Sequence, residues 1–112
     1  MRRDETYLLD ILIAARRALQ FCAALTPHDF EESDLHQFAV VKALEIIGEA
    51  SVKVSEQTKE EHPDIPWREM AGMRNVLIHE YSRIDVGKVW ETVQIDLPKL
   101  ITSISPLVPP EP

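Results

Sequence analysis

The feature that most restricts the fold is the spacing of apolar residues, which recur at steps of three and four along most of the chain. Such steps place side chains on one face of an α-helix, whereas a half-buried strand would alternate in steps of two. Only three of the 112 residues are glycine, so few positions interrupt the pattern. The spacing therefore predicts an all-α fold built from amphipathic helices.

The first two predicted helices are the longest. One is expected to begin after Asp4, a good N-cap residue, and to run to about Leu25, before a Thr-Pro step that cannot stay helical. The next is expected to start near Ser33 or Asp34, where an aspartate and a glutamine have the spacing of a capping box. It extends as far as Glu60, which makes it roughly 25 residues long.

Two further helices complete the pattern. The third is expected to start at Pro66, a residue that suits the first helical position, and to run as far as Ser82. The fourth is capped by Asp85 and keeps one apolar phase to Ile104 across Pro98, so we interpret it as one helix kinked at the proline. Four amphipathic helices joined by short loops predict an antiparallel four-helix bundle.

Length and composition fit a single domain. The chain is 45% hydrophobic, which is enough for one core without disulfides or metal, and we expect a domain over residues 1–105 with a proline-rich tail over 106–112. The single cysteine, Cys22, falls in an apolar stripe and suits a core position in a reducing compartment. No secretory signal or apolar run of about 18 residues is recognised, so we expect a soluble cytoplasmic protein without a membrane partner.

The charge of the chain disfavours a protein that coats nucleic acid in general, because the formal net charge is −7. The acidic residues gather in two apparent loops, and arginines stand near residues 68–83 and near the N-terminus, which leaves room for a local basic surface. The two acidic clusters are Asp29, Glu31, Glu32, Asp34 and Glu56, Glu60, Glu61, Asp64.

The segment RNVLIHEY, residues 74–81, carries the side chains best suited to chemistry. His79 can accept or donate a proton near neutral pH, and the planar guanidinium of Arg74 matches phosphate oxygens. Arg74 can hold the charge that builds on phosphorus when a ribose 2′-hydroxyl attacks, while Tyr81 positions the phosphate and Asn75 orients the imidazole. These residue types suit metal-free cleavage of RNA. The plainer alternative is a surface salt bridge for Arg74 and a core aromatic role for Tyr81.

An ideal helix would separate these side chains into two rows. Tyr81 lies about 20° from Arg74, whereas His79 lies about 140° away, beside Asn75. Either the helix distorts as it ends at Ser82, or a second copy of the chain supplies the other row. We favour a two-fold dimer that places this helix against its mate, so that each site draws on both subunits.

The octet resembles the Arg-X4-His-X-Tyr motif of the HepT-like ribonuclease toxins of the HEPN superfamily. The resemblance extends to "LEIIGEA" at 44–50, "HPDIPWREMAGMRN" at 62–75 and "VWETVQIDLP" at 89–98, and so covers nearly the whole chain. It implies a HEPN-like four-helix bundle that forms homodimers or higher oligomers. It also implies a toxic, metal-independent and cofactor-independent endoribonuclease that cleaves tRNA or mRNA.

The same resemblance implies roles for individual residues. Arg74 and His79 would be the catalytic pair, Asn75 an auxiliary residue, and Tyr81 the target of AMP transfer by a minimal nucleotidyltransferase antitoxin. A phosphodiester beside His79 would repel RNA and fill the cleft. The alternative is a helical module that docks the nucleotidyltransferase and has no chemistry of its own. The presence of both Arg74 and His79 favours the enzyme, because a docking surface does not need that pair.

Two carboxylates of the second predicted helix are a further candidate. Glu45 and Glu49 share a face with Lys42 and Lys53, which predicts solvated ion pairs, or alternatively an inward-pointing Glu49 that holds Arg74 in position. No histidine lies at a matching step, so no metal site is expected. The remaining candidates are expected to be structural: surface histidines at His28, His36 and His62, and core anchors at Trp67 and Trp90.

Overall fold

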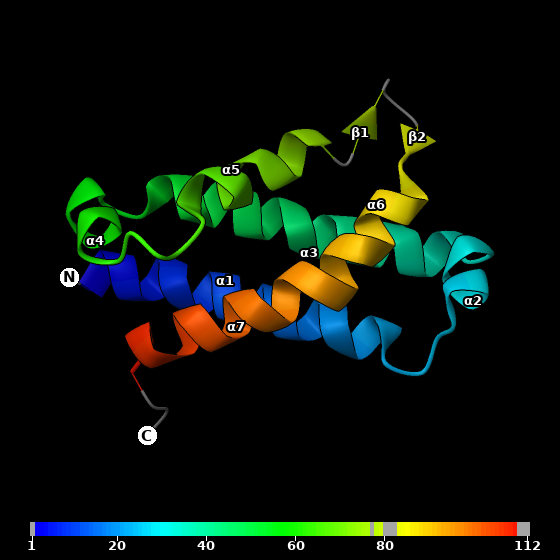
Figure 1. Cartoon of the computed structure of the whole chain (residues 1–112), viewed down its shortest axis with the longest axis horizontal. Helices are drawn as coiled ribbons and strands as arrows, with labels where there is room; N and C mark the ends of the chain where they lie inside the picture. The colour runs from blue at the N-terminus through cyan, green and yellow to red at the C-terminus, as the bar shows by residue number, and fades with distance from the viewer. Residues whose placement is uncertain (1, 77, 80–82, 110–112) are drawn as a thin grey trace.

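A computed structural model describes residues 2–76, 78–79 and 83–109, and it gives the backbone alone for residue 2 and for residues 74–76, 78–79 and 83. Its long helices are α1 (Arg2–Cys22), α3 (Asp34–Lys53) and α5 (Trp67–Val76). A fourth helical run joins α6 (Val86–Glu91) to α7 (Leu97–Ile104). These four segments run alternately up and down beside one another (Figure 1), which confirms the predicted all-α bundle.

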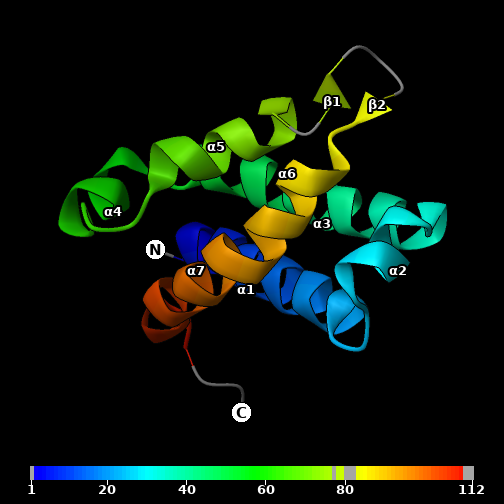
Figure 2. The same ribbon diagram turned by 45° about the vertical axis from the view of Figure 1, so that its right-hand side comes forward.

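The core lies between these segments, with α3 packed between α1 and α5, and α7 packed on α1 (Figures 1 and 2). Cys22 is 2% exposed, so its expected core position is confirmed, and burial raises the pKa of its thiol. Both tryptophans pack against this core as expected, and the ring of Trp90 lies 5.3 Å from that of Phe30. The largest side chains with almost no exposed surface are those of Phe30, Ile11, Leu44, Ile47, Met70, Leu97 and Ile104.

The first connection differs from the prediction. Asp4 does not cap α1 but lies in its first turn, and α1 ends at Cys22 instead of near Leu25. The acidic loop that follows contains a short helix, α2 (Pro27–Glu31). Thr26 caps α2 through a reciprocal pair of hydrogen bonds with Asp29, the capping-box arrangement that a threonine three residues before an acid allows.

α3 starts at Asp34, as predicted, but its cap differs from the predicted capping box. The cap is Ser33, whose hydroxyl accepts a hydrogen bond from the backbone N–H of His36, so the predicted capping box of Asp34 with Gln37 is wrong. Gln37 is 8% exposed and its side-chain amide donates to the carbonyls of Phe30 and Glu31. The glutamine therefore ties the end of α2 to α3.

The predicted long second helix is in fact two helices. α3 ends at Lys53, and a separate helix, α4 (Glu56–Glu61), starts after Ser55. The break has a physical cause, because the backbone N–H and the hydroxyl of Ser55 both bond to the carboxylate of Asp4 on α1. A continuous helix would have to give up these two hydrogen bonds.

The fourth helical segment keeps the predicted buried phase. Asp85 accepts a hydrogen bond from the backbone N–H of Lys88, which confirms it as the cap of α6. Between α6 and α7 lies one π-helical turn, η1 (Thr92–Asp96), just before Pro98. The disturbance of the helix that was expected at the proline is this turn. A wider turn relieves the clash between the proline ring and the preceding carbonyls.

The chain continues past α7 into a 3-10 turn, η2 (Ser105–Leu107). Leu107 and Val108 pack partly against the core. The boundary between a domain and a tail at residue 106 stays a prediction. None of the helices in the described ranges is long and apolar enough to cross a membrane.

Candidate active site

The first part of the octet belongs to a firmly anchored helix. The indole N–H of Trp67 donates to the carbonyl of His62 at 2.9 Å, and Ile65 is 3% exposed just before α5. One turn later Met70 is completely buried. The backbone of Arg74 and Asn75 lies in the last turn of α5, so the packing of Trp67 and Met70 fixes the position of the backbone of these two residues.

Two residues in the second part of the octet, Ile78 and His79, are not helical. α5 ends at Val76, and a two-residue strand, β1 (Ile78–His79), pairs in an antiparallel way with β2 (Arg83–Ile84). The prediction of a helix to Ser82 is therefore wrong at residues 78–79. His79 stands opposite Arg83 in this ladder, so the angle of about 140° between Arg74 and His79 on one helix does not apply.

The side chains of Arg74, Asn75 and His79 lie outside the described residues, and so does the whole of Tyr81. The roles predicted for them stay predictions. What the structure establishes is the placement of two backbones: Arg74 ends a helix and His79 lies in the strand that follows it. The octet thus spans two elements that are held differently: α5 is packed against the core, and β1 pairs with β2.

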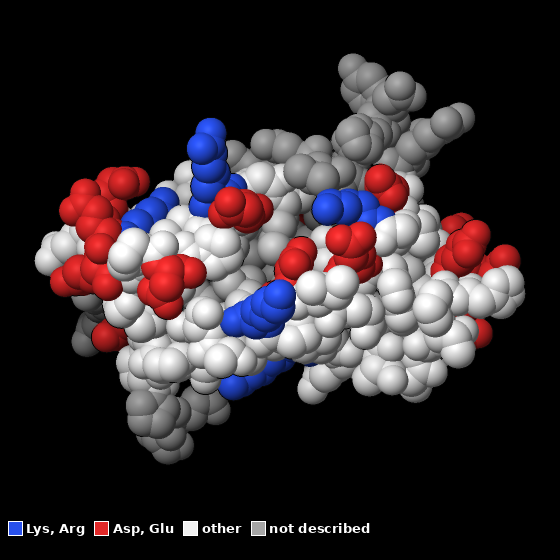
Figure 3. Space-filling model, viewed as in Figure 1, with Lys and Arg blue, Asp and Glu red and all other residues white. Residues whose placement is uncertain are grey.

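The groove beside the motif helix is acidic. A cavity of about 350 Å³ lies between α5 and the η1–α7 segment, with Met70 and Met73 at its floor. Three carboxylates and one lysine surround it, namely Asp64, Glu69, Asp96 and Lys99. Such a rim repels a phosphate backbone, so the groove does not suit RNA. Figure 3 shows further acidic side chains over α4 and α2, at the two ends of the bundle.

Glu49 does not point inward. Its side chain is exposed and lines a small cavity with Tyr7, Asp10 and Lys53, on the side of α3 that faces α1. α5 packs on another side of α3 (Figure 1). The predicted inward orientation of Glu49 is therefore wrong, whereas its contact with Arg74 stays a prediction, because the Arg74 side chain lies outside the described residues. Within the described part of the chain, neither Glu45 nor Glu49 forms the expected ion pair with Lys42 or Lys53.

The histidines that the structure describes in full are peripheral. His28 is exposed, and His36 is partly buried with its ring nitrogen Nδ1 at 2.6 Å from the hydroxyl of Ser33. His62 is partly buried and its backbone carbonyl holds Trp67. Over the described ranges, no group of three or more His, Cys, Asp or Glu is placed to hold a metal ion.

The polar cluster that the sequence did not indicate is centred on Asp4, which is 5% exposed. Its carboxylate accepts hydrogen bonds from the hydroxyls of Ser55 and Thr58, both at 2.6 Å, and these bonds lower the pKa of Asp4. All its partners lie more than 50 residues away in sequence, so no local motif could have pointed to it. The cluster is structural, because it joins the ends of two helices.

The sequence of the chain is similar to those of proteins named as ribonucleases. The family model described as "Ribonuclease HepT-like" matches residues 11–107. "Probable ribonuclease HepT" of Thermococcus cleftensis is 46% identical over 99 residues, which cover 88% of this chain and 90% of the relative. "Putative RNase MJ1380" of Methanocaldococcus jannaschii is 40% identical over 100 residues, or 88% of this chain and 92% of the relative.

A bacterial relative matches almost from end to end. "Putative RNase TTE0752" of Caldanaerobacter subterraneus subsp. tengcongensis is 32% identical over 111 residues, which cover 99% of both chains. No solved structure matches the chain significantly. The family match spans the octet, the second half of α1 and the whole of α3, α5 and α7, and the chain belongs to the HepT-like ribonuclease family.

Proposed function

We propose that the chain is a metal-independent endoribonuclease that acts as the toxin of a toxin–antitoxin pair. The observation that carries this proposal is the family match over residues 11–107, which includes an intact Arg-X4-His-X-Tyr motif at Arg74, His79 and Tyr81. Relatives named as ribonucleases align over about nine-tenths of the chain.

The proposed chemistry needs only the motif residues and the substrate. The imidazole of His79 takes the proton from a ribose 2′-hydroxyl, and the freed oxygen attacks the adjacent phosphorus. The bond from phosphorus to the 5′-oxygen breaks, which leaves a 2′,3′-cyclic phosphate. The leaving oxygen takes a proton from water to give a 5′-hydroxyl end, and His79 releases its own proton to solvent. Arg74 stabilises the charge on the phosphoryl oxygens during attack, and Asn75 orients the imidazole.

We further propose that two copies of the chain share each cleft, with Arg74 from one subunit and His79 from the other. The change from helix to strand within the octet supports a site assembled from separate elements. A two-fold axis would then create two equivalent sites. The substrate class is RNA, either tRNA or mRNA, and the acidic groove beside α5 favours its approach from another side of the motif.

Control of this activity is proposed to act through Tyr81. A minimal nucleotidyltransferase antitoxin would transfer AMP to the tyrosine hydroxyl. The new phosphodiester would place negative charge in the cleft and repel the RNA backbone. Replacing Tyr81 by phenylalanine removes the accepting oxygen, so Tyr81→Phe protein should not be modified by the antitoxin.

The direct test is RNA cleavage by purified protein in EDTA. We expect the wild type to cleave, and His79→Ala and Arg74→Ala each to lower the rate by at least about a hundredfold, the usual contribution of a proton-transfer or charge-stabilising group. Arg68→Ala is a matched control, since Arg68 is an exposed arginine on the same helix. Cleavage that required added metal would contradict the mechanism.

The alternative function is a non-catalytic module that docks a nucleotidyltransferase. The two functions differ when the chain is expressed without a partner. Growth arrest that His79→Ala relieves supports the ribonuclease. Harmless expression of the intact chain, together with stable binding of the transferase, supports the module.

A further inference from the structure

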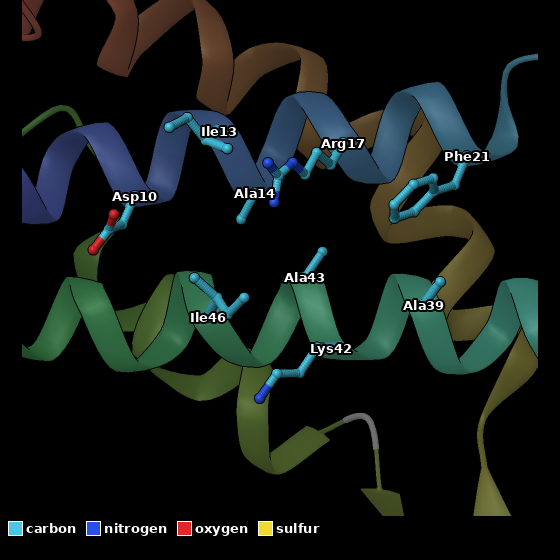
Figure 4. Close-up of a pocket in the computed structure, with 9 residues that line it drawn as sticks. All are labelled: Asp10, Ile13, Ala14, Arg17, Phe21, Ala39, Lys42, Ala43 and Ile46. Carbon is cyan, nitrogen blue, oxygen red and sulfur yellow. The ribbon is translucent and has the colours of Figure 1, made fainter.

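The exposed side of the α1–α3 pair carries a groove that the proposed active site does not use. The groove has a volume of about 340 Å³, and Ala14 of α1 faces Ala43 of α3 across its floor (Figure 4). Ile13 and Phe21 stand at its α1 edge and are 36% and 39% exposed. Small side chains at the floor and large apolar ones at the edge allow another helix to approach closely.

The apolar surface continues along α3 beyond the groove. Leu35 is 77% exposed and lies one turn before Ala39, which lines the groove. Phe38 is 66% exposed and lies one turn before Lys42, another lining residue. Large apolar side chains that group on one face of a soluble protein usually mark an interaction surface.

The charges on this face are arranged symmetrically. Asp10 and Arg17 are both exposed, both line the groove, and lie seven residues or two helical turns apart on one stripe of α1. Their midpoint falls between Ile13 and Ala14. Within the described part of the chain, neither of the two side chains forms an ion pair.

The midpoint of the pair formed by Asp10 and Arg17 is level with the floor of the groove, because Ala14 faces Ala43 of α3 there (Figure 4). The pair therefore has the symmetry of a two-fold axis that crosses both helices at this level.

We propose that this face binds the same face of a second copy of the chain, with α1 and α3 each antiparallel to their counterparts. A rotation about the axis between Ala14 and Ala43 brings Asp10 opposite the partner subunit's Arg17, twice. A surface whose charges pair with the opposite charges of an identical surface is self-complementary, as a two-fold homodimer requires.

The alternative relation within the same face is less favourable. A two-fold axis parallel to the helices would keep each residue at its own level and place α1 on the partner's α3. Arg17 would then lie close to the partner subunit's Lys42, because both line the same groove. Like charges at close range oppose association, so the antiparallel arrangement is the one that we infer.

The size of the face is sufficient for such a contact. Two neighbouring helices of about 20 residues span about 30 Å by about 20 Å. This footprint is of the order of the roughly 800 Å² that each partner buries in a stable interface. The contact also covers Ile13 and Phe21, which are otherwise exposed to water.

This contact is separate from the shared cleft proposed above, because α5 packs on α3 away from the groove (Figure 1). It therefore does not depend on the chain being a ribonuclease. If both contacts form, the assembly contains more than two copies. Loss of the α1–α3 contact is expected to leave RNA cleavage in place.

The test is a reversal of charge, followed by its restoration. Asp10→Arg and Arg17→Asp each place like charges in both symmetric pairs, so each should weaken self-association about tenfold or more. The double variant Asp10→Arg/Arg17→Asp exchanges the charges and should recover the wild-type mass in light scattering or sedimentation equilibrium. Arg16→Asp is the matched control, because Arg16 is exposed but does not line the groove.

The outcomes separate the two proposals. Recovery of mass by the double variant supports the inferred contact whatever the nuclease result. The inferred contact is overturned if none of the four variants changes the measured mass, or if Arg16→Asp changes it as much as the groove variants do. Either result points to another occupant of the face. If the variants dissociate the protein to single chains, the inferred contact holds, and the separate shared-cleft dimer is contradicted.

Discussion

The carboxylate of Asp4 holds Ser55, 51 residues further along the chain, through a hydrogen bond of 2.6 Å from the serine hydroxyl. The second carboxylate oxygen accepts the backbone N–H of the same serine at 3.0 Å. Ser55 caps α4, so the acid at the start of α1 fixes where α4 begins. One buried carboxylate thereby sets the length of α3 and the direction of the chain toward α5.

Replacing Asp4 by alanine is expected to lower the free energy of unfolding by about 2–3 kcal/mol, because the hydrogen bonds from Ser55 and Thr58 to a charged group are lost together. Urea denaturation followed by circular dichroism measures this change. Glu5→Ala is the matched control, since Glu5 is an exposed acid on the same turn, and its effect should stay within about 0.5 kcal/mol. Equal effects of the two substitutions would show that the cluster does not stabilise the fold.

The contribution of Asp4 should disappear in acid. Its pKa is lowered in the folded state, chiefly by the Ser55 hydroxyl and then by that of Thr58, whereas the unfolded value is about 3.9. The stability that it adds is therefore fully present above about pH 4–5 and is lost as the pH falls through the folded pKa.

The measurement is the difference in unfolding free energy between the wild type and Asp4→Asn. We expect this difference to be constant from about pH 7 to pH 5 and to shrink below about pH 4. The pKa of Asp29 is also lowered, mainly by the backbone N–H of Thr26, but both proteins contain it and its contribution cancels. A difference that grew as the pH fell would reverse the sign and refute the assignment.

Gln37 should be sensitive to loss of its amide. The variant Gln37→Met keeps the shape of the side chain but removes the donor that serves the carbonyls of Phe30 and Glu31. We expect a loss of about 2 kcal/mol, since two carbonyls then lack that partner. Gln20→Met on α1 is the control, because Gln20 is exposed. Thermal denaturation that ranked the two variants equally would argue against this role for Gln37.

A mixing experiment tests whether two subunits share each cleft. Arg74→Ala and His79→Ala proteins are each expected to be inactive alone. When they are unfolded together and refolded, half of the dimers are mixed, and each mixed dimer contains one site with both residues intact. The activity should therefore recover to about a quarter of the wild-type value. No recovery, with mixed dimers demonstrated by mass spectrometry, would place both residues of a site in the same subunit.

The apolar phase of the sequence was sufficient to predict the bundle. Val89, Val93, Leu97, Leu100 and Ile104 are all buried as predicted, even across the π-helical turn. Burial of one helix face is a local property that recurs every three or four residues, so the sequence displays it directly. Where a helix ends is less local, as the break at Ser55 demonstrates: the residue responsible is Asp4, on another helix.

The octet was harder to predict for a related reason. Its apolar residues Val76, Leu77 and Ile78 form a short run, and periodicity does not distinguish helix from strand in such a run. The residue types of Arg74 and His79 indicate the chemistry, but their spacing predicts a helix that continues to Ser82. The pairing of His79 with Arg83 depends on the chain turning back, which the spacing of side chains does not reveal.

The π-helical turn at Thr92–Asp96 has a consequence for how this family can vary in length. A turn closed by i→i+5 bonds holds roughly one residue more than an α-helical turn. In a homologue without a proline at the position of Pro98, deleting a single residue there would tighten the turn while Leu97 and Leu100 keep their orientation toward the core. The same deletion inside α3 would rotate everything after it by about 100°. Gaps between homologues should therefore concentrate at this point, one of the few where evolution can shorten a helix without rebuilding the interior.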